Sequence, residues 1–179
     1  MKTIEAQGMT FEECISKEEI AAAVQRVADR INQDYEGREP LFICTLNGAF
    51  IFAADLFRKI KLHSQITFIR LKSYDGTATS GQINEIVPLY DDVYGRDVII
   101  LEDIVDSGYT MQYYKEKLQN LGVKSIAVAS LLFKPEALLC PYSRPEYVGI
   151  EIPKEFIIGC GFDLDEYERN HEEIYRLKN

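Results

Sequence analysis

The stretch VIILEDIVDSGYTM, from Val98 to Met111, determines how the rest of the sequence is interpreted. Aliphatic residues lead into Glu102 and Asp103, and Asp106 and a Ser-Gly-Tyr-Thr segment follow. The aliphatic run predicts a buried strand, and the small polar residues predict a turn into a helix. Such a turn directs backbone N–H groups and the positive end of the helix dipole at one point, which favours an anion. The stretch therefore places three carboxylates beside a predicted anion site.

Buried strands alternate with helices on both sides of this stretch. The clearest helix begins after Ser16, which has capping-box spacing with Glu19, and its apolar residues recur on one face towards a turn at Gly37. Strands are expected at 41–46, 65–74, 97–101 and 125–133, an edge strand with Pro88 at 83–90, helices at 49–60 and 110–122, short late strands at 147–153 and 156–162, and a surface helix or strand at 171–179. This alternation predicts a single α/β domain over residues 1–179, built on a parallel sheet with right-handed connections.

Chemistry-bearing residues follow three of the predicted strands. Asn47 and Gly48 come after the strand at 41–46, the acidic stretch continues the strand at 97–101, and Lys134 follows the strand at 125–133. Ligands of parallel sheets lie beyond the carboxyl ends of the strands, so these residues are expected to meet at one site.

The turn from Ser107 to Thr110 suits a single phosphate group. Gly108 permits a tight backbone, and the Ser107 and Thr110 hydroxyls can add hydrogen bonds to those of the backbone. The lysine of a nucleoside-triphosphate loop is absent, so a terminal phosphate fits better than a triphosphate. The alternative is a plain strand–turn–helix in which Asp106 only caps the helix.

Glu102 and Asp103 lie at the ligand edge of the sheet, where carboxylates have two natural partners. One is a divalent cation such as Mg²⁺, and the other is a pair of sugar hydroxyls. A phosphate, a ribose and Mg²⁺ within a few residues describe a sugar-phosphate site, in which the carboxylates face the hydroxyls and metal while the loop amides face the phosphate.

Composition excludes several classes of protein. The chain has 29 acidic and 20 basic residues and a formal charge of −9, which argues against nucleic-acid binding. No apolar stretch approaches the length of a membrane span, and the N-terminus lacks the apolar core of a signal peptide. The widely spaced cysteines, with no C-x-x-C pair, disfavour zinc and favour free thiols in a cytoplasmic protein.

Together with LNGAFIFAADL, FIRLKSYDGTATSG, VASLLFK, VGIEIPKEFIIG and FDLDEYERN, the opening stretch resembles the hypoxanthine (hypoxanthine-guanine) phosphoribosyltransferases of the type I family. The motifs occur in the family's order between about Leu41 and Asn170. The resemblance implies a parallel-sheet fold with helices on both faces and a small hood built from the terminal segments. It implies transfer of the 5-phosphoribosyl group of phosphoribosyl pyrophosphate (PRPP) to a 6-oxopurine, hypoxanthine or guanine, giving IMP or GMP and pyrophosphate. It also implies Mg²⁺ as cofactor, a role in purine salvage, and a homodimer or homotetramer.

The resemblance also implies a role for each matched residue. Asp106 matches the catalytic base at purine N7, and Glu102 and Asp103 match the residues that bind the ribose hydroxyls and Mg²⁺. Asp163 matches a further metal-site carboxylate. The other matches are Ser107, Gly108, Tyr109 and Thr110 for the 5′-phosphate, Asn47, Gly48 and Arg169 for pyrophosphate, Lys134, Phe156 and Ile157 for the purine, and Ser73 and Tyr74 for a lid.

The pyrophosphate loop departs from the family pattern at Asn47. Many members carry a lysine or arginine there, so less positive charge is expected to act directly on the pyrophosphate. The resemblance further implies that the peptide between Leu46 and Asn47 can be cis.

Two of the purine matches have plainer interpretations. Position alone predicts that Lys134 is a strand-end lysine whose ammonium reaches solvent. As a purine ligand it would donate to a 6-oxo group and disfavour the amino group of adenine, because lysine has donors and no acceptor. Phe156 is either a core residue or an exposed ring on which a base stacks.

Two other functions remain open from the sequence. One is an RNA-binding attenuation regulator on the same fold, which the charge of −9 and the Lys134–Phe156 combination disfavour. The other is a Mg²⁺-dependent sugar-phosphate hydrolase, which the absence of a D-x-D-x-T motif disfavours.

Overall fold

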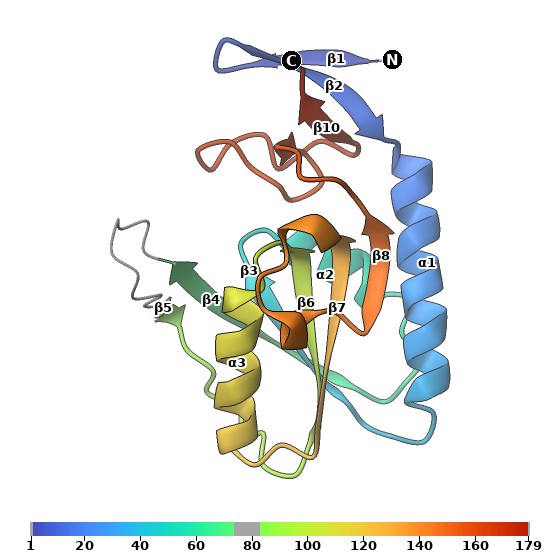
Figure 1. Ribbon diagram of the computed structural model, residues 1–179. Coiled ribbons are helices and arrows are strands. Elements are labelled where there is room, and N and C mark those ends of the chain that lie inside the picture. The colour runs from blue at the N-terminus through green and yellow to red at the C-terminus, as the bar shows by residue number, and fades with distance from the viewer. Residues whose placement is uncertain (1, 74–82, 179) are drawn as a thin grey trace.

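The computed structural model describes residues 2–73 and 83–178, which form two sheets and the helices that pack on them. The larger sheet consists of β3 (Leu41–Leu46), β4 (Gln65–Ser73), β5 (Ile83–Val87), β6 (Asp97–Val105), β7 (Ser125–Phe133) and β8 (Tyr147–Glu151). The smaller consists of β1 (Thr3–Ala6), β2 (Met9–Ile15), β9 (Ile157–Ile158) and β10 (Ile174–Leu177). The helices are α1 (Lys17–Asp34), α2 (Phe50–Phe57) and α3 (Tyr109–Asn120), with short 3₁₀ turns at Pro135–Ala137 and Pro141–Ser143. The smaller sheet lies above the larger one in Figure 1.

The larger sheet has the strand order β5-β4-β3-β6-β7-β8. The pairs β3–β4, β3–β6, β6–β7 and β7–β8 are parallel, and β5 adds an antiparallel edge to β4. The central strands are apolar along nearly their whole length because both faces of a parallel sheet are covered. The predicted parallel sheet is confirmed, and so is the edge strand, which ends before Pro88.

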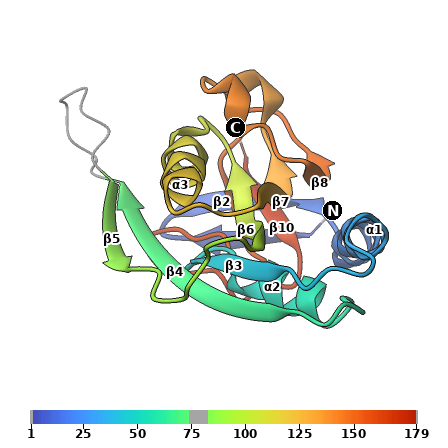
Figure 2. The ribbon, with the colours of Figure 1, turned by 90° about the horizontal axis from the view of Figure 1, so that it is seen from below.

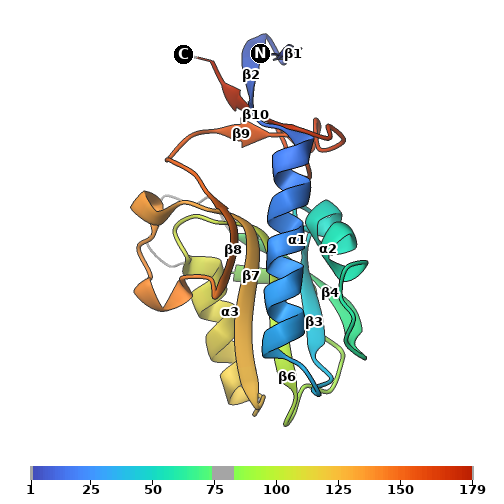
Figure 3. The ribbon, with the colours of Figure 1, turned by 90° about the vertical axis from the view of Figure 1, so that its right-hand side faces the viewer.

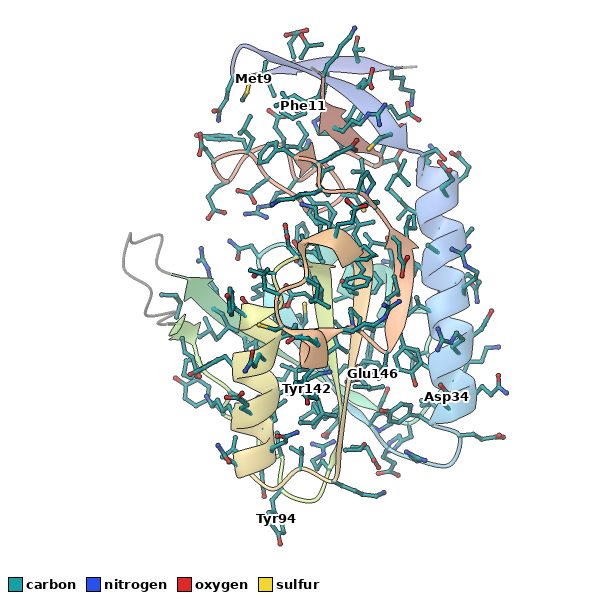
Figure 4. The ribbon with its side chains drawn as sticks, in the orientation of Figure 1. Met9, Phe11, Asp34, Tyr94, Tyr142 and Glu146 are labelled. Atoms are coloured by element: carbon teal, nitrogen blue, oxygen red, sulfur yellow. The ribbon has the colours of Figure 1, made fainter. Side chains whose placement is uncertain are left out.

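Helices cover both faces of this sheet, as predicted. Figures 2 and 3 show α1 and α2 on one face and α3 on the other. Met111, Tyr114 and Leu118 of α3 form one core with the inner residues of β3, β6 and β7. Asp34 lies at the far end of α1 (Figure 4). The Tyr147 hydroxyl donates a hydrogen bond to it at 2.8 Å, which joins the helix to β8.

The N-terminal and C-terminal segments together form the smaller sheet, which is the expected hood. Its order is β1-β2-β10-β9, so β2 from the beginning of the chain pairs with β10 from its end. Phe11, labelled in Figure 4, is fully buried in the hood core with Ile158 and Tyr175. The segment at 171–179, predicted as helix or strand, is a strand at Ile174–Leu177, whereas β1 and β2 had no sequence prediction.

Several predicted boundaries need correction. The strand expected at 97–101 continues to Val105, and the one expected at 156–162 is limited to Ile157–Ile158. The helix expected at 49–60 spans Phe50–Phe57, because the chain turns at Arg58. Within the described ranges, no helix is both long and apolar enough to cross a membrane. Cys14, Cys44, Cys140 and Cys160 are all free thiols, as expected.

The capping box predicted for α1 is present. The Ser16 hydroxyl accepts a hydrogen bond from the Glu19 N–H at 3.3 Å, and the Glu19 carboxylate accepts one from the Ser16 N–H at 2.9 Å. These bonds satisfy N–H groups that a helix leaves unpaired at its first turn. Ser16→Ala should therefore lower the free energy of unfolding by about 0.5–2 kcal/mol, measured by urea denaturation. Ser16→Thr keeps a hydroxyl and should recover most of the loss; equal losses in both variants would contradict a capping role.

Candidate active site

Parallel register brings the ends of three strands to one edge of the larger sheet. Cys44 of β3 lies opposite Leu101 of β6, so β3 ends where the acidic part of β6 begins. Val105 of β6 lies opposite Phe133, the last residue of β7. The segments that follow β3 and β7 therefore flank Glu102–Asp106, and the predicted convergence of the three places is confirmed.

Glu102 and Asp103 lie within β6 rather than after it, which corrects their expected place at the strand end. The Thr45 hydroxyl lies 2.7 Å from a Glu102 carboxylate oxygen, and Asp103 accepts the Ile104 N–H at 3.0 Å. Burial first, and the charge of Asp103 second, raise the pKa of Glu102 well above its ordinary value. Burial also raises the pKa of Asp103. The protein thus holds two close carboxylates in a place that disfavours two negative charges without a cation or strong donors.

Gly48 approaches these carboxylates so closely that it has no room for a side chain. A Cβ atom on Gly48 would lie 1.8 Å from Asp103 Oδ2. A Cβ atom on Gly161 would in turn lie 2.2 Å from the Gly48 carbonyl oxygen. At Gly48, the loop after β3 therefore packs between the Asp103 carboxylate of β6 and the backbone of the loop after β9. The predicted cis peptide between Leu46 and Asn47 is also confirmed.

The turn from Ser107 to Thr110 surrounds a small cavity of about 100 Å³. Gly108 has φ of 87°, a left-handed conformation that favours glycine, and a Cβ atom there would lie 2.8 Å from Ser143 Cβ. The N–H groups of Leu139 and Cys140 donate to the Ser107 carbonyl at 2.9 and 3.2 Å. The cavity is lined by Glu102, Ile104, Val105, Asp106, Ser107, Gly108, Thr110 and Met111. The predicted anion turn is thus a loop at the beginning of α3 that is held in place by hydrogen bonds from the segment after β7.

Asp106 does not cap α3, so the alternative interpretation from the sequence is wrong. The N-cap of α3 is Gly108, and no side chain caps it. The Asp106 carboxylate instead accepts a hydrogen bond from Lys134 Nζ at 3.0 Å. The Lys134 side chain is only 11% exposed, so its ammonium does not extend into solvent as the plainer interpretation expected. The structure brings the expected base and the expected purine ligand into direct contact.

Arg169 lies at the centre of a second cluster of charges. It pairs with Asp163 at 2.9 Å and with Glu166 at 2.8 Å, and it donates to the Gly161 carbonyl at 2.7 Å. Asn47 also donates to Glu166, at 3.3 Å. Hydrogen bonds from Arg169 and then Asn47 lower the pKa of Glu166. The structure therefore brings Asn47 and Arg169 together, as the resemblance implied.

Phe156 and Ile157 belong to the hood. Phe156 is 49% exposed and rests on Phe11 with ring centroids 6.2 Å apart, so it is not the core residue of the plainer interpretation. Ile157 is buried in β9. Ser73 is the last residue of β4, whereas Tyr74 and the rest of the expected lid lie outside the described residues.

Three residues of the site escaped the sequence interpretation. Thr45 is a buried polar residue in the otherwise apolar run LFICTL, and that irregularity was the signal that marked it. Gly161 belongs to a Gly-Cys-Gly segment, which resembles the start of a G-x-G-x-x-G dinucleotide-binding motif but lacks its third glycine, because residue 164 is leucine. Glu166 is one of several acids in a polar loop, and nothing in its local sequence distinguishes it.

A family model described as "Phosphoribosyl transferase domain" matches residues 13–165. The chain belongs to the phosphoribosyl transferase family. The hypoxanthine-guanine phosphoribosyltransferase of Lactococcus lactis is 37% identical over 165 residues, which cover 92% of this chain and 89% of that protein.

Solved structures of this family share the fold. A hypoxanthine-guanine phosphoribosyltransferase from Bacillus anthracis is 36% identical, with a TM-score of 0.87 over 94% of this chain and 97% of that one. The hypoxanthine phosphoribosyl transferase of Trypanosoma cruzi is 31% identical, with a TM-score of 0.89 over 98% of this chain and 95% of that one. The family is one of transferases, which favours group transfer over the RNA-binding and hydrolase alternatives.

Gly48→Ala tests the backbone packing beside Asp103. A methyl group there must displace either the loop or the carboxylate, and a shift of about 1 Å in a catalytic site can lower activity by about a hundredfold. We expect a loss of that order in phosphoribosyl transfer, measured by steady-state kinetics. Gly37→Ala is the control, because φ of 74° disfavours alanine there while nothing lies within 4 Å. It should reduce stability by about 1–2 kcal/mol and leave activity unchanged; similar activity losses in both variants would contradict the role of Gly48.

Proposed function

We propose that this protein transfers the 5-phosphoribosyl group of PRPP to a 6-oxopurine, hypoxanthine or guanine, and releases IMP or GMP and pyrophosphate. The observation that carries the proposal is the Lys134–Asp106 contact, which lies beside the braced turn at Ser107–Thr110. A lysine and a carboxylate in contact match two neighbouring atoms of an oxopurine, because O6 accepts a hydrogen bond and N7–H donates one. The names of the similar proteins agree with this substrate class.

PRPP binding is assigned to the edge of the larger sheet. The turn from Ser107 to Thr110, including the backbone of Tyr109, would hold the 5′-phosphate with N–H groups at the start of α3. Glu102 and Asp103 would bind the ribose hydroxyls, which donate to carboxylates. The backbone of Asn47 and Gly48 and the guanidinium of Arg169 would bind the pyrophosphate.

Mg²⁺ fits the carboxylate pair. No group of three or more His, Cys, Asp or Glu side chains in the described ranges could hold a metal by itself. Mg²⁺ is ordinarily bound by one or two carboxylates together with waters and substrate phosphates. Glu102 and Asp103 would supply those carboxylates, and Asp163 would add a further one once Arg169 turns to the pyrophosphate. The cation would neutralise charge on the leaving pyrophosphate.

In the proposed reaction, the C1′–O bond to pyrophosphate breaks and a bond from purine N9 to C1′ forms. Asp106 takes the proton from N7, so the purine does not become positively charged as N9 attacks. Lys134 exchanges its bond to Asp106 for one to the purine O6, which leaves the Asp106 oxygens free to face N7. Phe156 would stack on the purine ring, and the backbone at Ile157 would meet its edge.

The remaining assignments follow from the family. We propose that the whole chain, residues 1–179, acts as one domain in the cytoplasm. We assign a homodimer or homotetramer. The C-terminal strand β10 pairs with β2, and the C-terminal region of the T. cruzi enzyme has been studied for its role in oligomeric state and activity.

The test is a comparison of steady-state rates with hypoxanthine, guanine, xanthine and adenine at saturating PRPP and Mg²⁺. Formation of IMP or GMP with equimolar pyrophosphate, and little product from adenine, is expected. Release of inorganic phosphate or ribose phosphate without a nucleotide product would support the hydrolase alternative instead.

Lys134→Ala should remove selectivity for the 6-oxo group. Loss of a hydrogen bond from a charged donor is worth about 1.5–3 kcal/mol, and more when its partner is stranded, so kcat/KM for hypoxanthine should fall by about tens- to thousands-fold. The KM for PRPP should change little, as measured by initial rates at varied PRPP. Lys115→Ala is the matched control. Lys115 is also an ion-paired lysine with little exposure (14%), but it lies on α3 and pairs with Glu146, so its loss should leave kcat/KM for hypoxanthine unchanged. A loss of PRPP affinity in Lys134→Ala would assign this lysine to the phosphates.

Asp106→Asn should slow the chemical step without weakening PRPP binding. The amide keeps the shape but cannot take a proton, and general base catalysis contributes about 10²–10⁴-fold. Single-turnover rates should fall by that factor while the KM for PRPP stays within about a few-fold. Asp34→Asn, at the far end of α1, is the control: it removes the same charge and should leave both the single-turnover rate and the KM for PRPP unchanged. Near-normal single-turnover activity of Asp106→Asn would exclude Asp106 as the base.

A further inference from the structure

The Glu166 carboxylate is the meeting point of donors from three separate segments. Arg169 Nη2 lies 2.8 Å and Asn47 Nδ2 lies 3.3 Å from its Oε2 atom. Arg70 Nη2 lies 3.7 Å from its Oε1 atom. Arg70 comes from β4, where it is opposite Leu46 in the parallel register, directly beside the loop that contains Asn47. β3 and β4 are neighbours in the ribbon of Figure 1.

These donors form a cluster around one carboxylate rather than a set of isolated surface pairs. Arg169 is 18% exposed and is held in place by Asp163 and by the Gly161 carbonyl. Glu166 itself is 64% exposed, and an exposed ion pair contributes little to stability. The clustering of the arginines is therefore better explained by binding of an anion than by a contribution of Glu166 to the stability of the fold.

The position of this anion coincides with the pyrophosphate loop. Asn47 belongs to that loop, and Gly48 touches both Asp103 and Gly161. Asn47 is uncharged, so a charged donor has to come from another segment if the loop is to hold a strongly negative group. The Arg70 side chain is 41% exposed, so an anion from solvent can reach it.

We propose that Arg70 binds the pyrophosphate group and supplies the charge that Asn47 lacks, and that the Glu166 carboxylate occupies this position until PRPP displaces it. The proposal rests on the function proposed above, since it takes pyrophosphate as the ligand. An arginine fork binds phosphate oxygens in pairs, and pyrophosphate carries more negative charge than one carboxylate. Pyrophosphate therefore competes successfully for Arg70 and Arg169, and Glu166 is an internal competitor that lowers its affinity.

The experiment measures binding of Mg²⁺–pyrophosphate by isothermal titration calorimetry in the intact protein. Arg70→Gln should weaken binding by about three- to tenfold, because the lost contact is a half-exposed charged one. Arg58→Gln is the matched control, because Arg58 lies at the end of the helix that follows the loop and pairs with Asp55. It should bind pyrophosphate as the unmodified protein does.

The same measurement tests Glu166 in the opposite direction. Glu166→Gln should tighten pyrophosphate binding by about two- to fivefold, since it removes a competing charge. Glu168→Gln makes the same change in net charge two residues away, where the carboxylate meets His171 at 2.7 Å, and should have no effect. Weaker binding in Glu166→Gln would show that Glu166 only positions Arg169, and it would overturn the competitor role.

A rescue variant tests whether Arg70 and position 47 share one task. Asn47→Lys in the Arg70→Gln background should restore pyrophosphate affinity to within about twofold of the unmodified protein. Unchanged binding in Arg70→Gln would overturn the proposal even if IMP is formed normally. Absence of IMP formation in a protein that binds pyrophosphate through Arg70 would overturn the proposed function and leave this inference standing.

Discussion

Two neighbouring carboxylates, Glu102 and Asp103, are half-buried at the edge of the main sheet, and the rest of the site is arranged around them. Burial raises the pKa of both groups, and the charge of Asp103 raises that of Glu102 further. Hydrogen bonds from Thr45 and the Ile104 N–H offset only part of the cost of burying charge. In the proposed function, ribose hydroxyls and Mg²⁺ arrive with the substrate and would compensate this pair. Such partners would explain why so much negative charge lies next to the proposed phosphate site.

The other charged groups of the site are paired with one another. Lys134 meets Asp106, and Arg169 meets Asp163 and Glu166. Each pair keeps a charge from being left without a partner, and in the proposed reaction each would be exchanged for a contact with ligand. Under that proposal, part of the binding energy would be spent on breaking internal pairs, while the donors would already lie close to the positions that the substrate needs.

The two sheets contribute different parts of the site. The main sheet provides the carboxylates, the phosphate turn and Lys134, whose positions depend on strand register. The hood provides Phe156, and its C-terminal loop provides Arg169 and Gly161. The contact between Gly161 and the Gly48 carbonyl links that loop to the main sheet through backbone atoms alone. Because no side chain intervenes, the two loops constrain each other's position at the proposed pyrophosphate site.

Local patterns in the sequence were sufficient for the main sheet and much of the site. Apolar runs and turn residues predicted the parallel strands, the capping box predicted the start of α1, and the stretch from Glu102 to Thr110 predicted an anion turn beside carboxylates. Each of these depends on neighbours in the chain, which hydrophobic periodicity and turn chemistry report directly.

Contacts between distant segments were decided only by the tertiary structure. The pairing of β2 with β10 joins the two ends of the chain, so the local sequence of either strand alone does not predict the hood sheet. The sequence left Asp106 open as a helix cap and Lys134 as a solvent-exposed lysine, and their 3.0 Å contact settles both because it depends on the register of β6 and β7. The convergence of Arg70, Asn47 and Arg169 on Glu166 has the same origin. Local sequence specifies which groups a segment carries, whereas their distances depend on how strands from remote parts of the chain pack together.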